Sequence, residues 1–483
     1  MSVVVGVGGR ASAAPEALVT LVQQVLSGHR LTLAEVDVLA TIDHRTGHAG
    51  LALLAVSADA GIRGFTAAEL AGQAVAHPSA VVAAHSGTPS VAEAAVLAAG
   101  ATPLGPPEKA DDWVVAVGRV AAVRGPGQAG QEAGRDPGWF PPVPERLLHH
   151  GDVEVEPGMV DFAVNVHADE PPAFLSRALH AAIADLARYP DPARATAAVA
   201  AAHGIDPECV LLTHGAAEAF GLVAQQPWLR PAVVHPQFTE PEAALRAHGH
   251  DPRSLILTAQ AGFRLAGLDP QDADLVVVGN PTNPTSRLHP RAEVAQLGDT
   301  ATLLVDEAFL DVVEGIEAPV DSLVPLAAGD PRILVTRSLT KTYSIAGLRI
   351  GYLVGHPDVL RRLAVRRSPW PVSTLAAAAA EACVSPEGLA YAAQVRADLP
   401  SRLVALQEVL GSRGFAVVED PRGPFVLARH PEAARIRERL RAARVAVRRA
   451  DTFPGLDETW LRFAARGAAE VSALGAVLDR LGD

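Results

Sequence analysis

The sequence predicts an α/β protein in two parts, a small N-terminal α/β unit and a larger α/β unit that ends in a smaller α+β part. Short, uninterrupted apolar runs such as residues 275–279 and 302–305 recur along the chain, and each leads into a polar loop. Such runs are typical of strands in a mostly parallel sheet that helices cover on both faces. A stretch rich in glycine and proline, residues 125–145, separates the two parts.

Composition restricts the class of function. The chain has 483 residues, of which 49% are apolar and 20% charged, so it is expected to be globular with ample core material. A formal charge of -13 and the absence of long basic runs argue against nucleic acid or an anionic membrane as a partner.

The cysteine content and the N-terminal sequence predict a soluble, cytoplasmic protein. Cys209 and Cys383 are too few and too far apart to suggest a disulfide framework or a zinc site, and we expect no metal site. The N-terminus lacks a basic region followed by an apolar one, and no run of about 20 apolar residues is present.

Residues 1–124 are expected to form the small α/β unit. An apolar strand pattern covers residues 3–8, a glycine-rich turn follows, and residues 15–25 have helical periodicity. The turn can present backbone N–H groups to an anion, and residues 6–11 satisfy a relaxed GxGxxA pattern. The acidic residue expected about 20 positions later is missing, so dinucleotide binding is the weaker interpretation of this turn.

Two further strands of this unit are expected to end at polar residues. The patterns at residues 40–45 and 81–85 each run from apolar residues into histidine or charged residues. Asp43, His44 and His85 are therefore candidate site residues, with solvated loop residues and helix caps as the alternative.

Three islands of the small unit carry a family resemblance. Residues 3–10, 41–43 and 87–93 together resemble the domain that forms the C-terminal part of the cobalamin-biosynthesis protein CbiG and the whole of CobE. In the third island, Ser90 or Thr88 would cap a helix. Domains of this kind are associated with corrin-ring intermediates, which implies a link to cobalamin biosynthesis.

Residues 125–145 are predicted to be a flexible linker. Their glycine, proline, glutamine and isolated charges cannot bury enough apolar surface to order the segment. The larger unit is then expected to cover residues 146–483, with its smaller C-terminal part beginning near residue 371.

Lysine usage points to one position in the larger unit. The chain has only two lysines, Lys109 in a polar, turn-prone run and Lys341 just after an apolar strand pattern at residues 332–337. A partly buried lysine can lose its proton and become a nucleophile, whereas arginine keeps its charge. Lys341 is therefore a candidate Schiff-base lysine, and a surface lysine is the alternative.

The residues around Lys341 carry a second resemblance. Ser338 and Thr340 offer hydroxyls, and the Arg349 guanidinium can hold a phosphate. Residues 338–349 resemble the lysine motif of fold-type I pyridoxal-phosphate (PLP) enzymes, in the branch of histidinol-phosphate aminotransferases and CobC/CobD-type threonine-phosphate decarboxylases. The resemblance implies a large, mostly parallel mixed sheet flanked by helices, a smaller α+β domain, and PLP bound by these four residues.

Two earlier segments match cofactor-binding segments of that family. Residues 214–219 are similar to its N-G-A-x-E turn, with His214 in place of asparagine. This likeness implies phosphate contacts by three residues of the turn, Gly215, Ala216 and Ala217. In the segment 233–241, Phe238 is the only aromatic residue, and it would stack on the pyridine ring.

Two strand ends match residues that act on the cofactor ring. Asn283, in the loop after residues 275–279, is similar to the asparagine that binds the 3'-oxygen. Asp306 would keep the pyridine nitrogen protonated and so preserve the ring as an electron sink. Phe309 stands where many aminotransferases have tyrosine. With Lys341, Asn283 and Asp306 are the predicted catalytic residues.

The segments at both ends of the larger unit match substrate-binding segments. His150 and Asn165 fall in segments similar to the arm that closes over substrate, and Arg462 matches the arginine that binds the substrate α-carboxylate. Arg466, four residues on, is a further candidate for the substrate. Tyr189 precedes Pro190 as in the family segment that reaches the cofactor phosphate of a neighbouring subunit, which implies a homodimer.

The two resemblances together indicate a PLP-dependent enzyme of cobalamin biosynthesis. We expect decarboxylation of L-threonine O-3-phosphate to aminopropanol phosphate. The alternative is transamination of a phosphorylated amine such as histidinol phosphate. A third interpretation is a cofactor-free scaffold that only presents the N-terminal domain.

Overall fold

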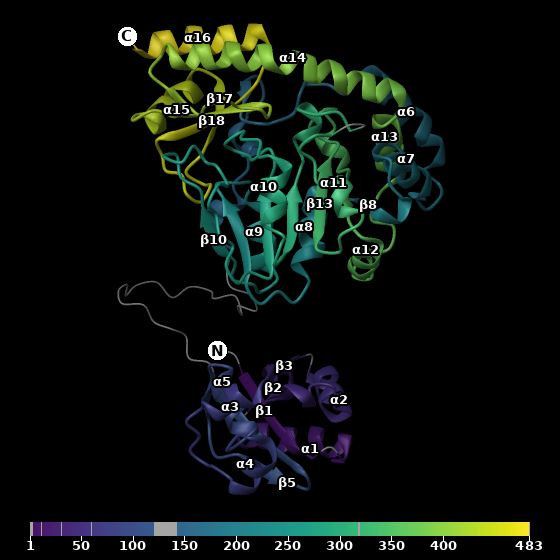
Figure 1. Cartoon of the computed structure of the whole chain (residues 1–483), viewed down its shortest axis with the longest axis vertical. Helices are drawn as coiled ribbons and strands as arrows, with labels where there is room; N and C mark the ends of the chain where they lie inside the picture. Colours follow the sequence, from purple (N-terminus) through teal and green to yellow (C-terminus); the bar gives the residue numbers. More distant parts are fainter. Residues whose placement is uncertain are drawn as a thin grey trace. The chain divides into compact units, whose positions relative to one another are not determined.

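The computed structural model describes residues 3–10, 12–29, 31–58, 60–119, 143–316 and 319–482. The chain divides into two compact units, Met1–Ala133 and Gly134–Asp483, and each is described by itself (Figure 1). The predicted linker, residues 125–145, lies outside the described residues as far as residue 142.

The smaller unit is built on one mixed sheet. Its strands are β1 (Val3–Gly9), β2 (Val36–Ile42), β3 (Gly61–Phe65), β4 (Thr102–Pro103), β5 (Glu108–Ala110) and β6 (Trp113–Arg119). The order is β3-β2-β1-β6-β4, and β5 pairs with β6. β1, β2 and β3 are parallel, whereas β6 runs antiparallel to β1.

Helices cover both faces of this sheet. They are α1 (Pro15–Gly28), α2 (Ala49–Ala58), α3 (Ala67–Ala71), α4 (Ala80–Ser86) and α5 (Ala92–Ala98). Alternate valines of β1 separate two cores, because Val3 and Val5 pack with α1 and α2 while Val4 packs with α5. Gly6 allows α5 to approach closely, since a Cβ there would lie 2.0 Å from the Ala92 carbonyl oxygen.

The expectation of a strand ending at residues 81–85 was wrong, because this segment lies in α4. Ser79 caps the helix by accepting a hydrogen bond from the Val82 N–H at 3.4 Å, and Gly87 ends it with a φ of 69°. A short apolar run fits a helix turn as well as a strand, so local pattern could not decide. The side chain of His85 lies outside the described part of the chain.

The larger unit contains a sheet of seven strands in the order β10-β9-β11-β12-β13-β14-β8. The strands are β8 (Val210–Thr213), β9 (Pro231–His235), β10 (Arg253–Ile256), β11 (Leu275–Gly279), β12 (Thr302–Asp306), β13 (Ile333–Ser338) and β14 (Gly351–Val354). All are parallel except β14, which is antiparallel to both of its neighbours. The apolar runs at 275–279 and 302–305 are strands at the centre of this sheet, as predicted.

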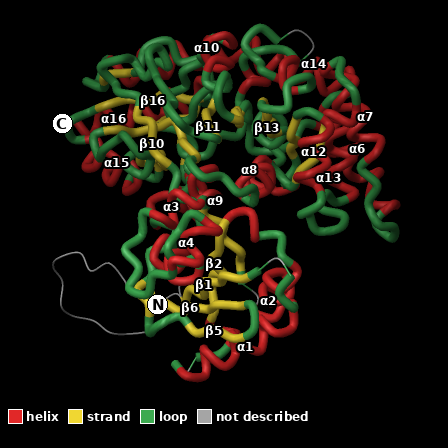
Figure 2. The backbone as a smooth tube through the Cα atoms, turned by 60° about the horizontal axis from the view of Figure 1, so that its bottom comes forward, coloured by secondary structure: helices red, strands yellow, loops and turns green. Residues whose placement is uncertain are grey.

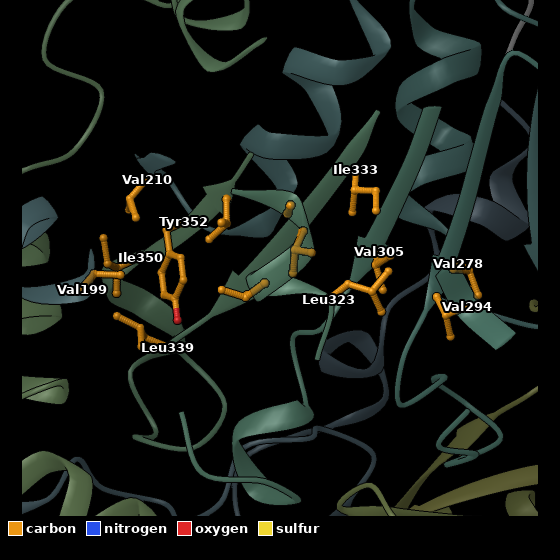
Figure 3. Packing of buried hydrophobic residues seen from close by; sticks show 14 of the residues in the cluster. Val199, Val210, Val278, Val294, Val305, Leu323, Ile333, Leu339, Ile350 and Tyr352 are labelled. Carbon is orange, nitrogen blue, oxygen red and sulfur yellow. The ribbon is translucent and has the colours of Figure 1, made fainter. Parts of the chain in front are cut away.

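Helices pack against both faces of the seven-stranded sheet (Figure 2). They are α6 (Ala173–Ala182), α7 (Ala193–His203), α8 (Ala216–Ala224), α9 (Glu240–Ala247), α10 (Arg291–Gln296), α11 (Val324–Ala327), α12 (Pro357–Ala364) and α13 (Thr374–Cys383). Val277 faces the core that contains α8, α9 and α12, whereas Val278 faces the core with α6, α7, α10, α11 and α13 (Figure 3). Burial on both faces explains why these strands are continuously apolar.

The smaller part of this unit combines a second sheet with long helices. Its sheet has the order β15-β16-β18-β17-β7, formed by β7 (Val160–Phe162), β15 (Ala416–Val417), β16 (Phe425–Arg429), β17 (Val445–Arg449) and β18 (Trp460–Ala464). Its helices are α14 (Pro386–Gly411), α15 (Ala433–Ala442) and α16 (Ala468–Gly482). β7 comes from the segment before the large sheet and pairs in parallel with β17. This pairing ties the two parts of the unit together.

No helix within the described ranges combines the length and the apolar character that crossing a membrane requires.

Candidate active site

A cavity of about 490 Å³ lies at the carboxyl ends of β8, β11, β12 and β13. This is the edge of a parallel sheet at which α/β proteins bind their ligands. Most of the predicted site residues line it, namely His150, Asn165, Gly215, Ala216, Ala217, Phe238, Asn283, Asp306, Ser338, Thr340, Lys341, Arg349 and Arg462. Segments separated by as many as 312 positions in the sequence, from His150 to Arg462, therefore meet around one cavity.

One end of the cavity has the features of an anion cradle. Gly215, with a φ of 73°, turns the chain from β8 into α8, whose first N–H groups have no partner within the helix. A Cβ on Gly215 would lie 2.8 Å from an Nη atom of Arg349, so only glycine leaves room for this guanidinium. The Ser338 and Thr340 hydroxyls are 2.8 Å apart beside them. Helix N–H groups, two hydroxyls and one guanidinium together suit a phosphate.

Asp306 contributes a buried carboxylate from the end of β12. It is 8% exposed, and its Oδ1 accepts one hydrogen bond, from the Ala308 N–H at 3.1 Å. Burial raises the pKa of Asp306 to about 7, although that hydrogen bond and the charge of Lys341 both oppose the rise. Ionising this carboxyl group costs free energy in the protein alone. A cationic ring nitrogen against it would stabilise the ionised form.

Lys341 follows β13 and faces the same cavity. Burial and the nearby charges of Arg462 and Arg349 together lower the pKa of Lys341 to about 8, although the charge of Asp306 opposes this shift. A substantial fraction of the amine is therefore neutral and nucleophilic near pH 8. The backbone carbonyl of Lys341 accepts a hydrogen bond from the His167 N–H at 3.1 Å, which fixes the loop against the arm around Asn165.

Arg462 and Asn283 are held together opposite this lysine. An Nη of Arg462, on β18, donates to Asn283 Oδ1 at 2.7 Å, and its other Nη donates to the Ala163 carbonyl. Arg462 is 4% exposed, and burial holds its pKa well below the usual range, with the charge of Arg448 acting in the same direction. A buried cation without a carboxylate partner in contact is suited to an anionic ligand.

Two unpartnered polar atoms face this part of the site. Asn165 Oδ1 and Arg462 Nε are buried and have no hydrogen-bond partner among the described residues. Buried polar atoms usually have partners, so both atoms are available to a bound molecule. Together with the anion cradle and Asp306, they fit a ligand with a phosphate, a basic ring nitrogen and further polar groups.

Phe238 and His150 form a wall of the cavity. Their ring centroids are 5.6 Å apart, and Phe238 also packs on Phe220 at 6.4 Å. Glu240 Oε1 lies 2.5 Å from His150 Nε2 and fixes the imidazole ring. The wall is therefore aromatic, braced and able to pack against a flat ring.

Two predicted site residues do not line the cavity in the single chain. The Arg466 guanidinium donates to three backbone carbonyls of the arm, those of Asp161, Val164 and Val166, at 2.6–2.8 Å. It thus positions the arm that carries Asn165. Tyr189 is 76% exposed and stacks on Trp370, with ring centroids 4.2 Å apart.

Sequence reasoning missed Arg448, which also lines the cavity. It lies on β17 directly opposite Arg462 of β18, is 2% exposed, and stacks over Phe453 at 4.8 Å. Burial lowers the pKa of Arg448 to about 10. The available signal was the arginine pair after the apolar run 445–447, but that pattern is common in so arginine-rich a chain.

Comparisons with known proteins agree with this geometry. Residues 157–481 match the sequence model of the family described as "Aminotransferase class I and II", and residues 3–118 match "Cobalamin synthesis G C-terminus". A histidinol-phosphate aminotransferase of Mycobacterium tuberculosis is 46% identical over 324 residues, covering 66% of this chain and 86% of the relative. The threonine-phosphate decarboxylase of Salmonella typhimurium is 31% identical over 335 residues, covering 66% and 90%.

A solved structure has the same fold. L-threonine-O-3-phosphate decarboxylase from Porphyromonas gingivalis superposes with a TM-score of 0.59 and 25% identity, covering 67% of this chain and 99% of that one. These likenesses confirm the predicted fold-type I architecture, both family resemblances and pyridoxal phosphate as the cofactor. The chain is a PLP-dependent enzyme of the decarboxylase or aminotransferase type.

Proposed function

Since the chain belongs to the aminotransferase class I and II family, we propose that it decarboxylates L-threonine O-3-phosphate and supplies aminopropanol phosphate to cobalamin biosynthesis. The match of residues 3–118 to a cobalamin-synthesis family supports this pathway, because fusion places both parts in one polypeptide. Both the decarboxylase and the aminotransferase relatives have names that include a phosphorylated substrate.

The pair Arg448 and Arg462 is the observation that favours threonine phosphate over histidinol phosphate as the substrate. Both guanidiniums are buried, lie on neighbouring strands and line the cavity, and neither belongs to the anion cradle around Arg349. Two cations suit a substrate with two anionic groups. Threonine phosphate has both a carboxylate and a phosphate, so each guanidinium can receive one of them.

The residues of the cavity fit pyridoxal phosphate and divide its recognition among them. When bound, this cofactor supplies an electron sink for negative charge on the substrate α-carbon. The backbone N–H groups at Gly215, Ala216 and Ala217 would hold its phosphate together with the side chains of Ser338, Thr340 and Arg349. Asp306 would hold the proton on the ring nitrogen, Asn283 would bind the 3'-oxygen, and Phe238 would pack on the ring.

Lys341 and Arg462 act on the substrate in this proposal. Arg462 holds the α-carboxylate, and its contact with Asn283 fixes the direction of the bond from the α-carbon to that carboxylate. When CO₂ leaves from the α-carbon, the protonated Lys341 side chain delivers a proton to the same atom and becomes the neutral amine. Its pKa of about 8 suits proton exchange near neutral pH.

Transamination of histidinol phosphate is the second candidate. It is favoured by the 46% identity to a relative with that name. Histidinol phosphate has a phosphate but no α-carboxylate, so one of the two buried arginines would face an uncharged group. In that reaction the Lys341 amine removes the proton from the α-carbon instead.

The test is a direct comparison of the two reactions in the cofactor-loaded enzyme. We expect CO₂ release from L-threonine O-3-phosphate without added keto acid, and its loss in Lys341→Ala. A matched control is Arg177→Gln, which removes an exposed arginine that pairs with Glu387 outside the cavity and should leave turnover unchanged. Amine loss from histidinol phosphate that depends on a keto acid, without CO₂ release from threonine phosphate, would replace the first candidate with the second.

We also propose that the enzyme is a cytoplasmic homodimer. The exposed stack of Tyr189 on Trp370 supports this, since large apolar side chains on a surface favour an interface. In the proposed dimer Tyr189 reaches the cofactor phosphate of the other subunit. Sedimentation of Tyr189→Asp against wild type tests it, and an unchanged dimer with unchanged cofactor affinity would count against the role of Tyr189.

A further inference from the structure

The smaller unit has a cavity of its own, of about 580 Å³, which the proposed reaction does not use. It lies at the carboxyl ends of the parallel strands β1 and β2 and is lined there by Gly8, Gly9, Ile42 and Arg45. Helices cover both faces of the sheet here, α1 and α2 on one side and α5 on the other. The carboxyl ends of parallel strands are the usual place for a ligand in an open α/β sheet.

Basic residues gather at this cavity although the unit as a whole is acidic. Residues 1–119 contain ten aspartates and glutamates but only six arginines and lysines. The cavity wall nevertheless has Arg10, Arg45 and Lys109 against a single acidic residue, Asp112. The cavity is therefore a local positive site within a negative domain.

Two of these cations have no counter-charge. Arg10 pairs with Asp112 at 3.5 Å. Arg45 and Lys109 form no ion pair with any other described residue. They come from different elements, Arg45 from the segment after β2 and Lys109 from β5. An anionic molecule in the cavity can therefore contact both, without displacing an existing partner.

The remaining lining is apolar or weakly polar. Ile42, Val82, Val91, Pro106 and Pro107 supply carbon surface, and His44 and His77 add ring nitrogens near the rim. Inorganic phosphate alone would leave such a surface unused. Apolar walls with a few converging polar groups are typical of sites for organic ligands.

We propose that this cavity binds a small organic acid with an apolar body and at least two acidic groups, held between Arg45 and Lys109. Its charged groups contact the two unpaired cations, and its body packs on the valine and proline wall. This gives His44, a candidate site residue from the sequence, a place at the rim of a ligand site. Asp43 lies outside the lining, with Oδ1 accepting a hydrogen bond from the His44 N–H at 2.7 Å.

The test uses the cofactor-loaded full chain and benzene-1,2,4,5-tetracarboxylate as the probe. Calorimetry is expected to show one site per chain. The double variant Arg45→Gln, Lys109→Gln should raise the Kd at least about tenfold, because two charge-assisted contacts are lost. Arg63→Gln is the matched control, since Arg63 belongs to the same unit but lies over Phe65 outside the cavity.

Several results would overturn the proposal. They are no binding to wild type, an unchanged Kd in the double variant, equal weakening by Arg63→Gln, or inorganic phosphate binding as tightly as the tetracarboxylate. A second measurement needs no variant. Lys109 is one of only two lysines, so its acetylation can be followed by mass spectrometry. The probe should slow acetylation of Lys109, and an unchanged rate would contradict its contact with the ligand.

Discussion

Replacing Asp306 with asparagine is expected to stabilise the cofactor-free protein at alkaline pH while weakening its hold on pyridoxal phosphate. Burial raises the pKa of Asp306 from 3.8 to about 7. Between these values the folded protein holds a proton that the unfolded chain has released, so stability falls as pH rises. About three pH units at 1.36 kcal/mol each give a cost of about 4 kcal/mol, complete above pH 7.

Asparagine removes that cost and keeps the acceptor oxygen for the Ala308 N–H. The cofactor-free variant should therefore unfold at higher urea than wild type at pH 8, and the difference should nearly vanish at pH 4. Hydrogen exchange in peptides that contain β12 would report the stability of the larger unit separately from that of the smaller unit. With pyridoxal phosphate bound, the wild type should instead be the more stable of the two proteins, because only the carboxylate can pair with a protonated ring nitrogen.

Equal stability of the two cofactor-free proteins at pH 8 would refute this reasoning, since it would mean that the buried carboxylate costs nothing. An asparagine variant that binds the cofactor as tightly as wild type would refute the role of Asp306. The two failures are distinguishable because the first is measured without cofactor and the second with it.

Three further outcomes are expected. Gly215→Ala should weaken cofactor binding by about tenfold or more, because its Cβ would meet the Arg349 guanidinium at 2.8 Å and the φ of Gly215 is positive. Gly221→Ala, within α8 and with open space around it, should leave cofactor binding unchanged. Equal effects of the two substitutions would contradict the anion cradle. Arg462→Lys should lower kcat/KM for threonine phosphate about a hundredfold, since lysine cannot reproduce the planar contacts to Asn283 and a carboxylate. A decrease of less than about threefold would contradict the role of Arg462 in binding the substrate. The rate at which the apo-enzyme regains its cofactor absorbance should rise with pH, with its midpoint near pH 8, and level off about one pH unit higher, where most of the Lys341 amine is deprotonated. A rise that continues beyond pH 10 would indicate an ordinary lysine.

The sequence was informative where one physical constraint acts on consecutive residues. Strands covered on both faces must be apolar throughout, so β11, β12 and their polar loops could be located without coordinates. Lys341 could be proposed as the cofactor lysine because lysine is so rare in this chain, and it lines the cavity. Both inferences used short segments, and the loops that follow parallel strands meet at one edge of the sheet.

Tertiary contacts decided the rest. All but two of the 41 basic side chains are arginines, so no local pattern distinguishes Arg448, which lines the cavity, from Arg466, which binds backbone carbonyls of the arm. That difference arises from the parallel pairing of β7 with β17, which joins segments nearly 300 positions apart. In the smaller unit, α4 read as a strand because five residues of apolar sequence do not fix a period.

The central claim is that the Lys341 amine carries the cofactor, and the low lysine content makes it directly measurable. Borohydride reduction of the loaded enzyme, digestion and mass spectrometry would locate the pyridoxyl group on one of the two lysines. We predict full labelling of the Lys341 peptide, none on Lys109, and loss of absorbance near 420 nm on reduction. A label on Lys109, or no label on either lysine, would contradict the account.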